Sequence, residues 1–124
     1  MIKRAAFASS DGDFVDYHFG RANTFFVYDI GGHSVTSSVL AGKRRCYRIP
    51  GQGRIEQGIA HQPEELERTA KLLSDCDAIF VVRIGASPAK FFIERGFRVF
   101  QVSERISDII EEIVKANDLE ESAF

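Results

Sequence analysis

Ala78-Ile79-Phe80-Val81-Val82 is an unbroken run of five apolar residues in the second half of the chain. A strand covered by helices on both faces of a parallel sheet has this pattern, whereas a half-exposed strand alternates apolar and polar residues. Helical patterns lie on both sides of the run in the sequence. We therefore predict that residues 78–82 form a buried parallel strand between two helices.

Three helices are predicted in this half of the chain, with another strand at residues 99–102. Pro63 suits the first position of one helix, and Ser87-Pro88 predicts the start of the next, which Gly96 ends. Three inward faces are expected at helical spacing: Leu66, Ala70 and Leu73; Phe92 and Ile93; and Ile106, Ile109, Ile110, Ile113 and Val114. We expect one domain over residues 1–116 and a frayed acidic tail over residues 117–124.

The first third of the chain has a different pattern, typical of an antiparallel meander. Strands are predicted at residues 2–9, 24–30 and 35–40, with a tight turn at Gly31-Gly32. Residues 41–62 are predicted to form a long basic loop. The sum is β-β-β-α-β-α-β-α, an α/β fold with a mixed five-stranded sheet flanked by helices. This order resembles the ribonuclease-H-like arrangement.

Composition excludes several classes of protein. The chain has 124 residues and a formal net charge of -2, so it is one domain without the basic character of a nucleic-acid-binding protein. No apolar stretch approaches the roughly 18 residues of a membrane span, and no signal peptide is recognised. Two cysteines are too few for a disulfide scaffold, so a cytoplasmic location is expected.

The stretch Asp16-Tyr17-His18-Phe19-Gly20-Arg21-Ala22 lies between two predicted strands. A histidine between aromatics is often a structural residue bonded to backbone. The functional interpretation is that the His18 imidazole is a neutral nitrogen ligand for a metal. Gly20 would then let the backbone approach a bulky ligand, and Arg21 would supply positive charge.

A second candidate is Lys43-Arg44-Arg45-Cys46-Tyr47-Arg48. Such a run is either a solvated face or a basic loop that captures an anionic ligand. Cations favour the thiolate, so Cys46 is a candidate soft metal ligand. Cys76 is expected to be structural and His33 exposed, while His61 remains open as a helix cap or a ligand.

Residues 83–87 follow the central strand and open a helix, so their free N–H groups could receive an anion beside Gly85. The spacing matches no phosphate-binding loop and no nucleophile elbow. Carboxylates are not placed at the strand centres as a two-metal nuclease requires.

These segments together resemble the dinitrogenase iron–molybdenum cofactor-binding family, whose members include NifX, NafY and the C-terminal part of NifB. The resemblance rests on residues 7–11, His18-Phe19-Gly20-Arg21-Ala22, residues 26–29, 73–78 and 83–87, and on Gly96. It implies a ribonuclease-H-like fold and a carrier that binds iron–molybdenum cofactor or an iron–sulfur precursor. His18 matches the family histidine implicated in that binding.

The combined prediction is a cytoplasmic carrier or scaffold for nitrogenase cofactor assembly, not an enzyme. His18 and Cys46 would ligate the cluster. The remaining site residues would balance its charge or let it approach: Gly20, Arg21, Lys43, Arg44, Arg45, Arg48 and Gly85. Its partners would be cofactor-assembly proteins or apo-dinitrogenase, with no nucleic acid and no membrane. The alternatives are a regulatory interaction module of the same fold and a metal-dependent nuclease that uses Asp11 or Asp29.

Overall fold

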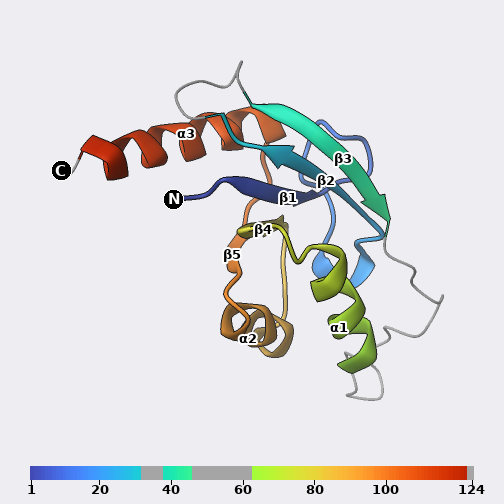
Figure 1. Cartoon of the computed structure of the whole chain (residues 1–124). Helices are drawn as coiled ribbons and strands as arrows, with labels where there is room; N and C mark the ends of the chain where they lie inside the picture. The colour runs from blue at the N-terminus through green and yellow to red at the C-terminus, as the bar shows by residue number, and fades with distance from the viewer. Residues whose placement is uncertain (32–37, 46–62, 123–124) are drawn as a thin grey trace.

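The computed structural model describes residues 1–31, 38–45 and 63–122. Five strands form one mixed sheet in the order β3-β2-β1-β4-β5 (Figure 1). The central strand β1 pairs antiparallel with β2 and parallel with β4, and β4 pairs parallel with β5. The elements in chain order are β1 (Arg4–Ala8), the 3-10 turn η1 (Phe19–Arg21), β2 (Thr24–Asp29), β3 (Val39–Arg45), α1 (Pro63–Leu72), β4 (Ala78–Val81), α2 (Ala86–Glu94), β5 (Arg98–Gln101) and α3 (Ile106–Ser122).

The central strands β1 and β4 are buried on both faces of the sheet, which explains their apolar runs. Alternate side chains of a strand point to opposite faces, so Ala6 and Ala8 join one core while Ala5 and Phe7 join the other. Helices α1 and α2 cover the first face and α3 covers the second, as Figure 1 shows. The predicted α/β class, the mixed five-stranded sheet and its parallel half are confirmed.

The third strand differs from its prediction. It was expected at residues 35–40, with a loop from residue 41, but β3 spans Val39–Arg45 and pairs with all of β2. An edge strand with no core on its outer side needs no apolar alternation, so its basic end has the composition of a loop. The prediction for residues 35–37 lies outside the described part of the chain.

The helices follow their predicted faces with one exception. Helix α1 begins at Pro63 as predicted, and α2 begins at Ala86, with Gly85 as its N-cap. Phe92 is buried, but Ile93 is 57% exposed, so its predicted inward position is wrong. Consecutive helical residues lie about 100° apart, and only one of the two can face the sheet. No helix among the described residues is both long and apolar enough to cross a membrane.

The last helix runs further than expected. Residues 117–124 were predicted to be frayed, but α3 continues to Ser122. The side chain of Asn117 is buried; its Oδ1 accepts from Ile2 N at 3.0 Å, and its Nδ2 donates to Ile2 O at 2.8 Å. This pair of hydrogen bonds attaches the end of α3 to the residues before β1.

Candidate functional site

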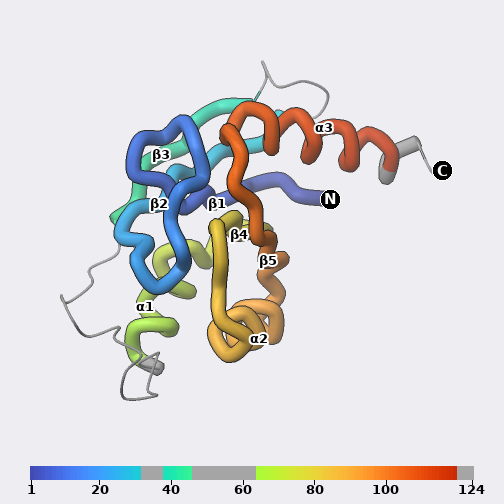
Figure 2. Tube along the Cα trace, turned by 180° about the vertical axis from the view of Figure 1, so that it is seen from behind, coloured from blue at the N-terminus to red at the C-terminus, as the bar shows by residue number. Residues whose placement is uncertain are grey.

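Two loops meet where the parallel strands β1 and β4 end. The amide of Val82 donates to the carbonyl of Tyr17 at 2.9 Å, and the amide of Phe19 donates to the carbonyl of Arg83 at 2.8 Å. Figure 2 shows the loop that leaves β1 running beside the segment that leaves β4. His18 lies between the two bonded residues of its loop. The fold therefore brings the predicted histidine turn and the predicted anion-binding segment into contact.

The η1 turn has a buried anchor and an exposed tip. Phe19 is 1% exposed, and its ring packs edge-on against Phe92 with centroids 5.3 Å apart. The amide of Arg21 donates to His18 O at 3.0 Å, which closes the turn. His18 itself is exposed and makes no side-chain hydrogen bond to any described residue. The described contacts do not support the structural interpretation of His18, because its ring bonds to no described backbone group.

A side-chain cluster fixes the base of this turn. The hydroxyl of Tyr17 donates to Asn23 Oδ1 at 3.1 Å, and Thr24 Oγ1 donates to the same oxygen at 2.9 Å. Asn23 follows η1 and Tyr17 precedes it, so the bonds span residues 18–22. These bonds hold the backbone on both sides of His18 in place.

The run of three basic residues is divided between the two faces of the sheet. In the antiparallel register of β2 and β3, Lys43 lies opposite Phe26 and Arg45 lies opposite Thr24. Arg44 lies opposite Phe25, whose side chain is on the α1 face of the sheet. The Nζ of Lys43 lies 5.6 Å from the centroid of the Phe26 ring. Strand geometry therefore prevents the three cations from acting as one patch.

Arg44 is engaged in a structural ion pair. Its Nη1 lies 2.5 Å from Asp75 Oδ1 and donates to the carbonyl of Leu72 at 3.0 Å. Arg4 pairs with the same carboxylate. The two guanidinium groups hold the pKa of Asp75 well below its usual range, and Arg44 has the larger effect. Arg44 thus joins β3 to the end of α1, which leaves it less free for a ligand than its neighbours.

Three other arginines lie toward the end of the sheet at which β1 and β4 have their carboxyl ends. Arg21 comes from η1, Arg45 from the end of β3, and Arg83 from the segment after β4. All three are exposed, and none forms an ion pair within the described ranges. Arg83 was not among the site residues predicted from the sequence. The available signal was its position directly after a buried parallel strand, where ligands commonly bind.

The other predicted residues have different outcomes. Gly20 is exposed, and a Cβ there would meet no described atom within 4 Å. Gly85 is the exposed N-cap of α2, and no side chain caps the helix there. Cys46 and Arg48 lie outside the described residues, as do His33 and His61.

The carboxylates of the nuclease alternative are separated. Asp11 follows β1 at its carboxyl end, where its Oδ1 accepts from the amides of Asp13 and Phe14, and these bonds lower its pKa. Asp29 pairs with Arg4 at the opposite end of β1, with 2.5 Å between Oδ1 and Nε. No group of three or more histidine, cysteine, aspartate or glutamate residues in the described ranges could hold a metal ion. The described carboxylates therefore do not form a two-metal centre.

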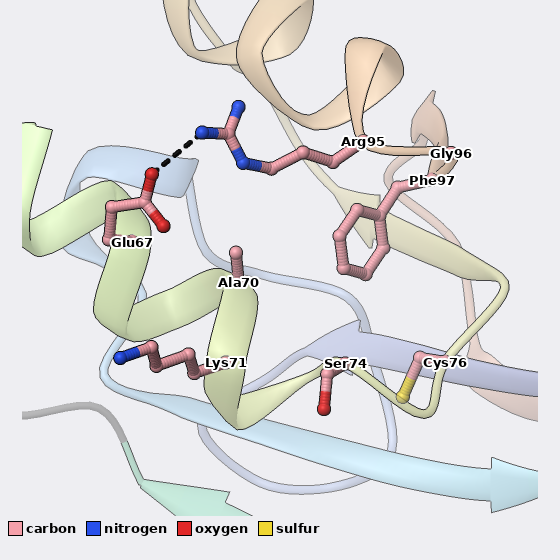
Figure 3. Close-up of a pocket in the computed structure, with 8 residues that line it drawn as sticks. All are labelled: Glu67, Ala70, Lys71, Ser74, Cys76, Arg95, Gly96 and Phe97. Atoms are coloured by element: carbon pink, nitrogen blue, oxygen red, sulfur yellow. Dashed lines mark hydrogen bonds and ion pairs between the residues drawn. The ribbon is translucent and has the colours of Figure 1, made fainter.

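A small cavity lies at the opposite end of the sheet from His18, between α1 and the turn from α2 to β5 (Figure 3). Its volume is about 280 Å³, and an ion pair of 2.6 Å between Arg95 and Glu67 spans one end. Cys76 lies at the other end, where burial raises the pKa of its thiol to about 12. A thiol that stays protonated is a poor metal ligand, in agreement with the structural role expected for Cys76.

The fold defines a small α/β protein with an exposed histidine turn at the ends of two parallel strands. The chain belongs to the family described as dinitrogenase iron-molybdenum cofactor, whose model matches residues 1–116. NifX of Azotobacter vinelandii is 32% identical over 112 residues, which cover 89% of this chain and 64% of NifX. NifB of Klebsiella pneumoniae, an FeMo cofactor biosynthesis protein, is 36% identical over 83 residues, which cover 67% of this chain and 17% of NifB.

Two solved structures share the fold. The crystal structure of PH0822 has a TM-score of 0.60 and 23% identity, and the match covers 91% of this chain and 89% of PH0822. The mj0327 protein of Methanocaldococcus jannaschii has a TM-score of 0.57 and 9% identity, with 94% and 92% of the two chains covered. These matches support the arrangement of the sheet and helices.

Proposed function

We propose that this protein is a carrier or scaffold that binds iron–molybdenum cofactor, or an iron–sulfur precursor of it, during nitrogenase cofactor assembly. The observation that carries the proposal is the exposed His18 on a turn bonded to the Arg83 segment. Membership of the dinitrogenase iron-molybdenum cofactor family and the NifX and NifB relatives support it. The strand order supports a ribonuclease-H-like assignment of the fold.

The proposed chemistry is binding without turnover. A nitrogen of the His18 imidazole coordinates a metal of the cluster, and the arginines around it offset the cluster's negative charge. Gly20 leaves space for a bulky ligand next to the backbone. Cys46 would supply a thiolate and Arg48 a further cation, while Lys43 and Gly85 would act from the margin of the site. Arg44 is left out of this proposal because its guanidinium is paired with Asp75.

The setting of this activity is also a proposal. The cluster would come from, or pass to, nitrogenase cofactor-assembly proteins or apo-dinitrogenase in the cytoplasm. A carrier must release its cargo, and a site that is open to solvent on one side suits such an exchange.

The test is anaerobic titration of the protein with isolated iron–molybdenum cofactor, followed by gel filtration, visible absorption and iron analysis. We expect cofactor to co-elute with the wild-type protein and less of it to co-elute with His18→Ala or Cys46→Ala. His33→Ala is the matched control for loss of a histidine and should bind normally. Equal binding by all variants would place the site elsewhere, and no binding by the wild type would refute the carrier proposal.

A further inference from the structure

Arg83 lies on a backbone segment that is held from both sides. Its carbonyl accepts from the amide of Phe19 at 2.8 Å, and the next amide, that of Ile84, donates to Gln101 Oε1 at 3.0 Å. The amide of Val82 is bonded to the η1 loop as well. The backbone around Arg83 is therefore fixed between η1 and β5, while the side chain is exposed.

These bonds also place Arg83 beside His18. Segments joined by backbone hydrogen bonds lie about 4.8 Å apart, so the two residues are neighbours across the joint between the loops. An arginine side chain spans a greater distance than this, and its guanidinium can reach a ligand held by the imidazole. The nearest acidic residue to His18 in the sequence, Asp16, already has hydrogen-bond partners, because its carboxylate accepts from the amide and hydroxyl of Ser10.

We infer that Arg83 binds the same anionic ligand as His18, and that it acts with Arg21 and Arg45 as the charge-selecting part of the site. The inference rests on the proposed function. Arg4, Arg44, Arg95 and Arg105 each pair with a carboxylate, whereas Arg83 has no such partner among the described residues. A guanidinium that is left unneutralised on a fixed backbone is suited to receive a multiply charged metal–sulfur anion.

The experiment compares Arg83→Gln and Arg83→Lys with Arg98→Gln. Arg98 is also exposed and has no ion pair among the described residues, but it begins β5 and therefore lies at the opposite end of the sheet. Both Gln variants lower the net charge equally. Binding of isolated iron–molybdenum cofactor and of tetrathiomolybdate, a simple sulfur-containing dianion, is measured at several salt concentrations, with thermal unfolding as the folding check.

We expect Arg83→Gln to weaken binding about tenfold or more and to reduce its salt dependence, because a charged hydrogen-bond donor is lost. Arg83→Lys should keep the salt dependence and part of the affinity, and Arg98→Gln should stay within about twofold of the wild type. Equal binding by Arg83→Gln and Arg98→Gln would overturn the inference. Arg83-dependent binding of tetrathiomolybdate without cofactor binding would refute the proposed function alone, and binding of neither probe would overturn both.

Discussion

Gly12 lies directly against the ring of Phe26. A Cβ at residue 12 would be 2.7 Å from Phe26 Cε2, and the φ of Gly12 is +79°. The loop between β1 and η1 therefore packs onto β2 at a point where only glycine fits. Ser9 Oγ accepts from the amide of Gly12 at 2.9 Å and holds the loop in this position. This contact restrains the segment that leads into His18.

We expect Gly12→Ala to lower the free energy of unfolding by about 2–3 kcal/mol, because the new Cβ meets the Phe26 ring and the positive φ is strained. Gly20→Ala is the matched control, since Gly20 has open space and no positive φ, and its effect should stay below about 0.5 kcal/mol. Urea unfolding of both variants measures the difference. Equal stability of the two variants would contradict the close packing of the loop.

Asn117→Ala should destabilise the protein by about 2–3 kcal/mol, because the buried amide and carbonyl of Ile2 each lose a partner. Alanine favours the helix more than asparagine does, so a loss of stability cannot come from helix propensity. Leu119→Ala on the same helix is the control, because Leu119 is largely exposed and should change stability little. The measurement is the denaturant midpoint of unfolding. A midpoint for Asn117→Ala equal to that of the wild type would show that the bonds to Ile2 are not stabilising.

Acid should lower the free energy of unfolding of the protein, because it protonates the carboxylate of Asp75. Its folded pKa is depressed by Arg44 and Arg4, so its contribution to stability is fully present above the unfolded pKa of about 4 and is lost progressively as the pH falls from there through the lower folded pKa. The carboxylate is 43% exposed, and we expect a contribution of about 1 kcal/mol. Asp75→Asn should reduce stability at pH 7 and should reduce it by a smaller amount at pH 2. Glu94→Gln, at an exposed carboxylate without an ion pair among the described residues, should not reproduce this pH dependence.

Cys76 should react slowly with iodoacetamide in the folded protein. Burial raises its thiol pKa to about 12, so at pH 8 its thiolate fraction is at least about 100-fold below that of a free cysteine. A Cys46→Ser variant leaves Cys76 as the only thiol, and mass spectrometry follows its alkylation. Urea should restore the rate of an unhindered thiol. Rapid alkylation in the native state would mean that the thiol is accessible and ionised.

Periodicity predicted the elements that are buried on one or two defined faces. The run in β4 and the isoleucine stripe of α3 each reflect burial against the sheet. β3 was misplaced because an edge strand with basic residues has no burial pattern. The end of α3 was missed because its anchor is a polar residue, Asn117, that bonds to a segment distant in the sequence.

The proposed site could be inferred only in part from the sequence. His18 was selected because it lies in a polar stretch between two apolar runs, and the structure places it on an exposed turn anchored by Phe19. The contact between the His18 turn and Arg83 was not predictable from local sequence, because it depends on backbone bonds between two separate loops. The division of Lys43, Arg44 and Arg45 between two faces depended on recognising that they belong to a strand.

The central position of β1 affects how the chain folds during synthesis. β1 pairs with β2 on one side, but its other edge has no partner until residues 78–81 of β4 have left the ribosome. Until then the nascent chain exposes an unpaired central edge and two apolar faces, which favour association with other chains. The length of chain between β2 and β4 therefore sets how long this central edge stays unpaired during synthesis.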